Sequence, residues 1–198
     1  MAVVLGRLLS IFWILAAAGC GPQLPTYQDP LADLSSARGV DVPENVPVKA
    51  GSTVALTLGS NVEKFLKYYD DGRVYAASVG ASKELLEEGN PQYLVDGAVA
   101  AIKRQYPKIK TVEDLASAAR QRVATTFVLD IKTKAGMYPG DQTTADIIII
   151  ALDAQQRPIS RITARGATEI RPYQPPRIRE ANDQALRELN GKAERLLR

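Results

Sequence analysis

Four consecutive isoleucines, Ile147 to Ile150, lie within the stretch from Ala145 to Leu152, in which Asp146 is the one polar residue. Branched side chains of this kind favour extended backbone, and the stretch has no polar residue at every second position that would face water. An unbroken apolar run of this length therefore predicts a strand that is covered on both faces. The chain must build a sheet in which at least one strand is fully buried.

Further strands are predicted around this one. Residues 127–132 and residues 159–170 alternate apolar and polar side chains, which is the period of two that is typical of half-buried strands. The polar turn 153–157 joins the second of these to the isoleucine-rich strand, so a hairpin beside a third strand is expected. Residues 53–58 alternate in the same way and predict one more strand.

Helices are expected before and after these strands in the chain. Apolar residues recur every three or four positions over 91–106, which predicts an amphipathic helix that Pro107 ends. Ser60 and Glu63 have the spacing of a capping box, in which each side chain accepts a free backbone N–H at a helix start. That helix is expected to end before Asp71-Gly72. Other expected elements are a strand over 73–79, a short helix over 82–88, a helix from the Thr111–Asp114 cap to Val123, and a last helix over 177–197.

Together these elements predict an α+β fold. The expected architecture is a two-layer sandwich, a small and mainly antiparallel sheet of three to five strands with helices packed on it. A single domain is assigned to residues 52–198, long enough to bury one core. The preceding segment, residues 20–51, contains five prolines and no sustained apolar period. Because proline fixes φ and lacks a backbone N–H, this segment is interpreted as a tether, with a docking segment for a partner as the alternative.

The amino terminus has the composition of an export signal. Arg7 precedes an apolar stretch over residues 8–18, and small residues follow. A membrane-spanning helix needs about 20 predominantly apolar residues, whereas eleven residues separate Arg7 from Gly19. Export is therefore favoured over a spanning helix. An ordinary signal peptide, cut after Ala18, is one form that the export signal would take.

The end of this stretch, Ala17-Ala18-Gly19-Cys20, resembles the lipobox of bacterial lipoproteins, although Ala17 stands where leucine is commoner. The resemblance implies that residues 1–19 are a lipoprotein signal peptide, removed between Gly19 and Cys20. It also implies that the Cys20 sulfur carries diacylglycerol and that its new amino group is acylated, with palmitate as the expected acid. Cys20 is the single cysteine, so it has no internal disulfide partner, and the chain has no histidine to activate it as a nucleophile.

The lipoprotein resemblance also implies a location. Three acyl chains would hold the mature protein on a membrane without spanning it, since each buried methylene contributes about 0.8 kcal/mol. In enterobacterial lipoproteins an aspartate directly after the lipidated cysteine keeps the protein at the inner membrane, and here that residue is Gly21. The resemblance therefore implies anchoring in the cell outer membrane, with the domain facing the periplasm.

Candidate catalytic groups are few. The absence of histidine leaves the usual metal sites and nucleophile–base pairs without support. Adjacent carboxylates occur at 70–71, 87–88 and 113–114, but neighbouring residues do not share a helix face, and solvated surface is the simpler interpretation. No glycine motif for a nucleotide follows a predicted strand. The sequence therefore predicts a protein that is not an enzyme and has no cofactor or metal, with a carboxylate-based envelope hydrolase as an alternative.

Basic residues gather near the carboxyl end. Residues 157–198 contain 10 Lys and Arg against 5 Asp and Glu, while the whole chain has a formal net charge of only +3, too small to indicate nucleic acid as a partner. Guanidinium groups bind phosphate and carboxylate through paired hydrogen bonds. A candidate basic binding face is therefore formed by Arg157, Arg161, Arg165 and Arg171, with a charged edge strand that resists aggregation as the alternative.

These features together predict a non-catalytic outer-membrane lipoprotein. Its membrane contact is the lipid at Cys20, and its periplasmic domain is expected to bind another envelope component, which would be a protein, lipopolysaccharide or peptidoglycan. An auxiliary subunit of an envelope transport or assembly machine is the second interpretation. Fold class alone does not choose between them.

Overall fold

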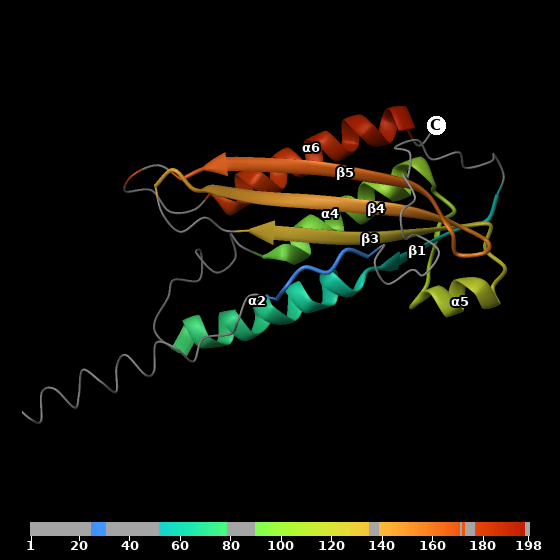
Figure 1. The fold of residues 1–198 in the computed structure, drawn as a ribbon, viewed down its shortest axis with the longest axis horizontal. Coiled ribbons are helices and arrows are strands. Elements are labelled where there is room, and N and C mark those ends of the chain that lie inside the picture. The colour runs from blue at the N-terminus through green and yellow to red at the C-terminus, as the bar shows by residue number, and fades with distance from the viewer. Residues whose placement is uncertain are drawn as a thin grey trace, which may run out of the picture.

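The computed structural model describes residues 25–30, 52–78, 90–134, 139–170, 172 and 177–196. They form a five-stranded open sheet with helices packed on it (Figure 1). The strand order is β2-β1-β3-β4-β5. The strands are β1 (Val54–Leu58), β2 (Lys110–Thr111), β3 (Thr125–Lys134), β4 (Gln142–Asp153) and β5 (Pro158–Glu169), and the helices are α2 (Ser60–Ser78), α4 (Pro91–Gln105), α5 (Leu115–Arg120) and α6 (Ile178–Leu196).

The predicted α+β class is confirmed, and the sheet is mixed. β3, β4 and β5 form an antiparallel meander with long ladders, whereas β1 pairs in parallel with both β2 and β3. Parallel pairing requires a crossover connection, and the helices α2 and α4 lie between β1 and β2 in the chain. The predicted helices at 91–106 and 177–197 correspond to α4 and α6 within two residues at each end.

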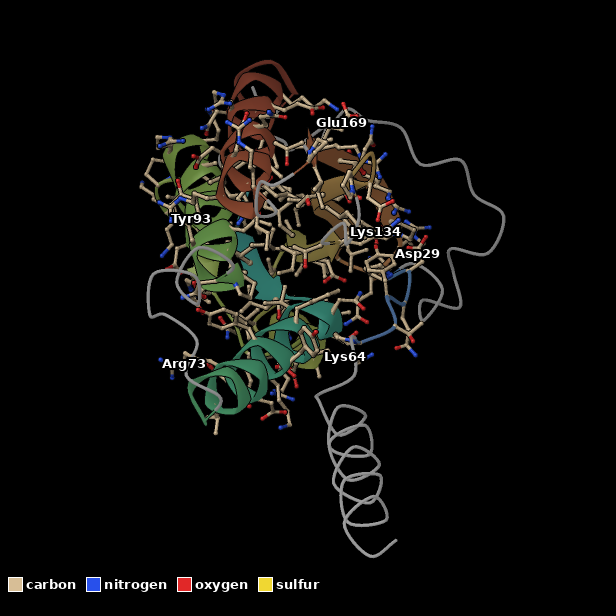
Figure 2. All side chains as sticks on the ribbon, turned by 90° about the vertical axis from the view of Figure 1, so that its left-hand side faces the viewer. Asp29, Lys64, Arg73, Tyr93, Lys134 and Glu169 are labelled. Atoms are coloured by element: carbon tan, nitrogen blue, oxygen red, sulfur yellow. The ribbon has the colours of Figure 1, made fainter. Side chains whose placement is uncertain are left out.

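The main hydrophobic core lies between one face of the sheet and the helices. Figure 1 and Figure 2 both show α4 and α6 on the same side of the sheet, with α2 running beside them at the β1 margin. Ile147 and Ile149 of β4 are buried against this layer, as is Phe127 of β3. The helices contribute Val62 and Phe65 from α2, Leu94 and Ile102 from α4, and Ala185 and Leu189 from α6.

The opposite face of the sheet is also apolar and covered. Ile148 and Ile150 belong to a second cluster with Val128 and Leu152, and Leu115 of α5 packs against it. Successive isoleucines of β4 therefore point alternately into two separate apolar clusters. This confirms the prediction that the Ile147–Ile150 strand is buried on both faces.

The α2 region differs from the prediction. The helix does not end before Gly72, and residues 73–78 of the strand expected over 73–79 are helical, because one 19-residue helix continues to Ser78. Within it, Lys67 binds Asp71 at 2.8 Å in an i,i+4 ion pair that supports the helix through the expected stop. A glycine inside a helix costs about 1 kcal/mol relative to alanine, which such contacts offset. The helix expected over 82–88 lies outside the described residues.

The helix that follows β2 is also shorter than predicted. Asp114 caps it, since its side chain accepts the Ser117 N–H at 2.7 Å, but α5 ends at Arg120 rather than at Val123. Arg122 adopts a positive φ of 51°, a conformation that a continuing helix does not allow. Val123 lies after this turn and is buried beside Ala55 and Ala118 instead.

Helix α6 closes the exposed edge of the sheet. β5 is the last strand, and its free backbone groups would otherwise be open to another chain. Side chains of α6 bind these groups along the strand. Lys192 donates to the Thr163 carbonyl at 2.6 Å, Glu188 accepts the Arg165 N–H at 2.9 Å, and Gln184 accepts the Ala167 N–H at 3.1 Å.

Candidate functional site

The three described arginines of the candidate basic face each form an ion pair with an aspartate. Arg161 and Arg165 lie on one face of β5, and Arg157 lies at the turn between β4 and β5. Arg171 lies outside the described residues. The ion pairs are Arg157–Asp153 at 2.7 Å, Arg161–Asp29 at 3.1 Å and Arg165–Asp146 at 2.7 Å.

Of the three pairs, Arg165–Asp146 has the most buried carboxylate, although the Arg165 side chain is itself 61% exposed. Two guanidinium nitrogens of Arg165 reach the two oxygens of Asp146, at 2.7 and 3.0 Å, and Asp146 is almost fully buried. This hydrogen bonding raises the pKa of Arg165. A buried carboxylate needs such a partner. The sequence placed Arg161 and Arg165 on one surface, but their aspartate partners neutralise most of the charge that a ligand would meet.

A short amino-terminal segment, residues 25–30, packs against the domain. Its Tyr27 ring covers the second apolar cluster, and Lys132 lies 5.1 Å from the ring centre in a cation–π contact. Burial of the hydroxyl raises the pKa of Tyr27. These residues fall in the range interpreted as a tether, and in the structure they belong to the packing of the folded domain.

Asn61 joins this segment to the core. Its amide oxygen accepts the Gln28 N–H at 3.0 Å, and its amide nitrogen donates to the Gln28 carbonyl at 2.6 Å. The same nitrogen donates to Asp130 at 2.6 Å. Asn61 therefore pairs with the backbone of residue 28 as a neighbouring strand would.

Asp130 lies beneath this contact and is fully buried. Burial raises the pKa of Asp130, while hydrogen bonds from Asn61, from the Ile131 N–H and from the Val62 N–H oppose the rise. The Val62 N–H, in the first turn of α2, also donates to the Gly59 carbonyl at 3.1 Å. Gly59 provides the room, since a Cβ there would meet Asp130 at 2.8 Å. This carboxylate fastens a helix start, a strand and the amino-terminal segment together, which is a structural role.

Two cavities among the described residues bear on function, and the larger of these lies where β1 begins. Its volume is about 480 Å³, and most of the surface of its wall is apolar. The Tyr106 ring at this wall packs against Phe127 with a centroid distance of 5.2 Å, and burial raises the pKa of Tyr106. Two lysines, Lys108 and Lys110, are part of the lining. The other lining residues are Ser52, Thr53, Val54, Gln105, Pro107, Ile109, Gln121 and Val123, so the described wall contains two cations and no carboxylate.

The smaller cavity, of about 310 Å³, lies where β1 ends. Its wall has the opposite charge, with three carboxylates from Glu63, Glu113 and Asp114 around apolar residues that include Leu58 and Ile150. The hydrogen bonds to Ser117 lower the pKa of Asp114, so this group is an ionised helix cap. Among the residues that the structure describes, no three acidic, histidine or cysteine side chains are close enough to hold a metal ion.

The sequence reasoning named the arginines and missed the cavity at the start of β1. Its residues come from three separate stretches of the chain, within 52–54, 105–110 and 121–123, so no local sequence spacing indicated them. The only local signal was the break at Pro107, which ends α4 and leaves Lys108 and Lys110 on the short connection and edge strand that follow.

The chain matches no protein-family model and no curated protein. Its fold is similar to that of several solved structures at low identity. The PelC dodecamer from Paraburkholderia phytofirmans aligns at 8% identity with a TM-score of 0.43, over 78% of this chain and 93% of that one. The hypothetical protein CT253 from Chlamydia trachomatis aligns at 12% identity with a TM-score of 0.40, over 74% and 98%. A minor lipoprotein from Acinetobacter baumannii aligns at 8% identity with a TM-score of 0.36, over 74% and 89%.

These likenesses are remote, and no functional argument rests on them. Among the helices within the described residues, none combines the length and the apolar character needed to cross a bilayer.

Proposed function

We propose that this protein is a non-catalytic lipoprotein of the bacterial outer membrane, anchored through Cys20, whose periplasmic domain binds an anionic envelope component. Support for the anchor comes from the Ala17-Ala18-Gly19-Cys20 motif, which lies outside the described residues. Support for binding comes from the cavity at the start of β1, where Lys108 and Lys110 flank an apolar wall.

The chemistry of this cavity selects a ligand class. An apolar wall holds acyl or aromatic groups through burial of their surface, at about 25 cal/mol per Å². The two ammonium groups favour phosphate or carboxylate, and no acidic side chain on the described wall opposes them. A ligand with an apolar body and an anionic head fits both features. Lipopolysaccharide and anionic phospholipids have this chemistry.

Reversal of the two lysines should weaken binding of such a ligand. We expect the double variant Lys108→Glu with Lys110→Glu to bind fluorescent lipopolysaccharide or phosphatidylglycerol about tenfold more weakly or worse, a loss of about 1.4 kcal/mol. The measurement is a titration of the mature protein in detergent.

The matched control for that titration is the double variant Lys103→Glu with Lys134→Glu. It makes the same change in net charge at exposed positions that do not line the cavity. Binding should persist in this control. An equal loss of affinity in both double variants would show that net charge alone causes the effect. Unchanged affinity in the Lys108→Glu, Lys110→Glu variant would show that the cavity is not the binding site.

The anchor has a direct chemical test. Cells supplied with labelled palmitate should transfer the label to the wild-type protein and not to Cys20→Ala, because the thioether and the new amino terminus both belong to this residue. The variant should also leave the membrane fraction, since stable attachment depends on the acyl chains. Incorporation that persists in Cys20→Ala would contradict the proposed anchor.

A carboxylate-based envelope hydrolase is the second candidate, and the acidic cavity at the end of β1 is the observation that favours it. A general acid at neutral pH needs a raised pKa, whereas the pKa of Asp114 in this wall is lowered. The remaining pair, Glu63 and Glu113, can be examined by replacing each with glutamine and assaying cleavage of envelope glycans.

The alternative role, as an auxiliary subunit of a transport or assembly machine, can be tested by crosslinking in intact cells and identifying the crosslinked partners.

A further inference from the structure

The packed amino-terminal segment, residues 25–30, determines which end of the domain lies nearest to Cys20. Pro30 lines the cavity at the end of β1, together with Leu58 and Ser60. Tyr27 lies further along, against Lys132 near the end of β3. From residue 30 back to residue 25, the chain therefore runs toward the carboxyl end of β3. Figure 1 shows this segment in blue, beside β3 and α2.

Specific contacts hold this segment in place on the surface of the domain. Gln28 is paired on both of its backbone groups by Asn61, and its side chain accepts from Lys64 at 2.6 Å. Asp29 adds the ion pair with Arg161 at 3.1 Å. Because these contacts fix residues 27–29, the point from which the anchor leaves the domain is also fixed.

The distance from that point to the lipid is short. Five residue steps separate Cys20 from Pro25. A fully extended chain spans at most about 3.6 Å per residue, so Pro25 lies within about 18 Å of Cys20. The opposite end of β3 is farther away, since nine steps along a strand add about 30 Å. A free tether over the whole of residues 20–51 would have imposed no such limit.

We propose that the end of the domain where β3 and β5 finish and where α4 and α6 begin faces the phospholipid surface of the anchoring leaflet. This inference rests on the proposed lipidation of Cys20. Figure 2 looks onto this end, where Lys134, Glu169, Tyr93 and Arg73 are labelled.

The side chains at this end suit a position close to a bilayer surface. Val74 follows Arg73 on the part of α2 that extends toward this end and is 70% exposed, the larger of two exposed fractions among the big apolar side chains described. Lys134 is exposed at the end of β3. Val74 is thus an exposed apolar residue beside one cation, Arg73, which pairs with Asp70 at 4.0 Å. Such a residue is suited to the boundary between headgroups and water.

The same orientation turns the cavity with Lys108 and Lys110 away from the anchoring membrane. That cavity is lined by Thr53, Val54 and Val123, at the end where β1 and β3 begin. Its ligand would then arrive from the periplasmic side and not from the leaflet that holds the anchor. The cavity and the lipid act at opposite ends of one rigid sheet.

Fluorescence quenching can measure this orientation. Cys20 carries the lipid, so a single new cysteine at Lys134→Cys or at Gln155→Cys takes the fluorophore alone. The mature lipidated protein is placed in vesicles of phosphatidylethanolamine and phosphatidylglycerol that carry a headgroup quencher. We expect the label at residue 134 to lose most of its fluorescence and the label at residue 155 to lose little. Equal loss at both sites, or the reverse order, would overturn the orientation.

Two controls separate this inference from the proposed anchor. A flexible insertion of about 20 Gly and Ser residues before Pro25 adds roughly 25 Å of reach and should abolish the difference between the two labels. If the two labels are quenched equally in the lipidated protein without the insertion, the orientation is contradicted and the proposed anchor is not. If the protein carries no palmitate and stays off the vesicles, the proposed lipoprotein function fails instead.

Discussion

Replacement of Gly166 by alanine is expected to destabilise the domain by about 3 kcal/mol or more. A Cβ at this position of β5 would lie 1.8 Å from the Ala181 carbonyl oxygen and 2.7 Å from the Ala185 nitrogen. Both are backbone atoms of α6, so no side chain can rotate away, and the whole helix must move off the sheet edge. Such a movement would also break the contacts that α6 makes to the β5 backbone. Chemical denaturation of wild type and variant measures the difference.

The control is the same glycine-to-alanine substitution on α6 itself, at Gly191. A Cβ at Gly191 meets no atom within 4 Å, so Gly191→Ala should stabilise the helix by about 0.5–1 kcal/mol through its higher helix propensity. A Gly166→Ala protein as stable as wild type would contradict the close packing of α6 on β5. A Gly191→Ala protein that unfolds as readily as Gly166→Ala would show that the loss is not specific to the strand contact.

Replacement of Asn61 by alanine is expected to cost about 3 kcal/mol and to release the amino-terminal segment. Three hydrogen bonds disappear, and the partners left behind include both backbone groups of Gln28 and the buried carboxylate of Asp130. A buried polar group without a partner costs about 1–3 kcal/mol, and a charged one more. Amide exchange at Gln28 should become rapid, and the free energy of unfolding should fall.

Lys64→Ala is the matched control for this effect. Lys64 contacts the same residue, but its hydrogen bond to the Gln28 side chain is exposed. Exposed substitutions of this kind usually change stability by less than about 0.5 kcal/mol. If Asn61→Ala leaves exchange at Gln28 as slow as in wild type, the segment is not held by Asn61, and the basis for a fixed orientation on the membrane is lost.

The fold was predictable from the sequence where the apolar pattern within a single element was enough to identify it. The isoleucines of β4 predicted burial on both faces, and the alternation in β3 and β5 predicted the antiparallel meander. Local stop signals were less reliable. Gly72 did not end α2, because side-chain pairs along the helix outweigh the preference of one residue.

The site was less predictable because it depends on contacts between distant residues. The arginines gather in the sequence, but Asp29 and Asp146 neutralise two of them from positions 132 and 19 residues away. Tyr27 lies in a proline-rich stretch whose composition indicates no packing. Its place is explained by the apolar sheet face of Val128, Ile148 and Ile150, which it helps to bury. The charge of a surface is set by pairs across the fold, and sequence spacing along one strand does not show them.

The central claim is that Cys20 is the lipidated amino terminus of the mature protein. The most direct measurement is the mass of the first tryptic peptide of the membrane-extracted protein. The sequence has no Lys or Arg between Cys20 and Arg38, so the account predicts a peptide that begins at Cys20, ends at Arg38 and carries diacylglycerol and an N-linked acyl chain. A mature protein that retains Met1, or one in which Cys20 is an unmodified thiol, would contradict it.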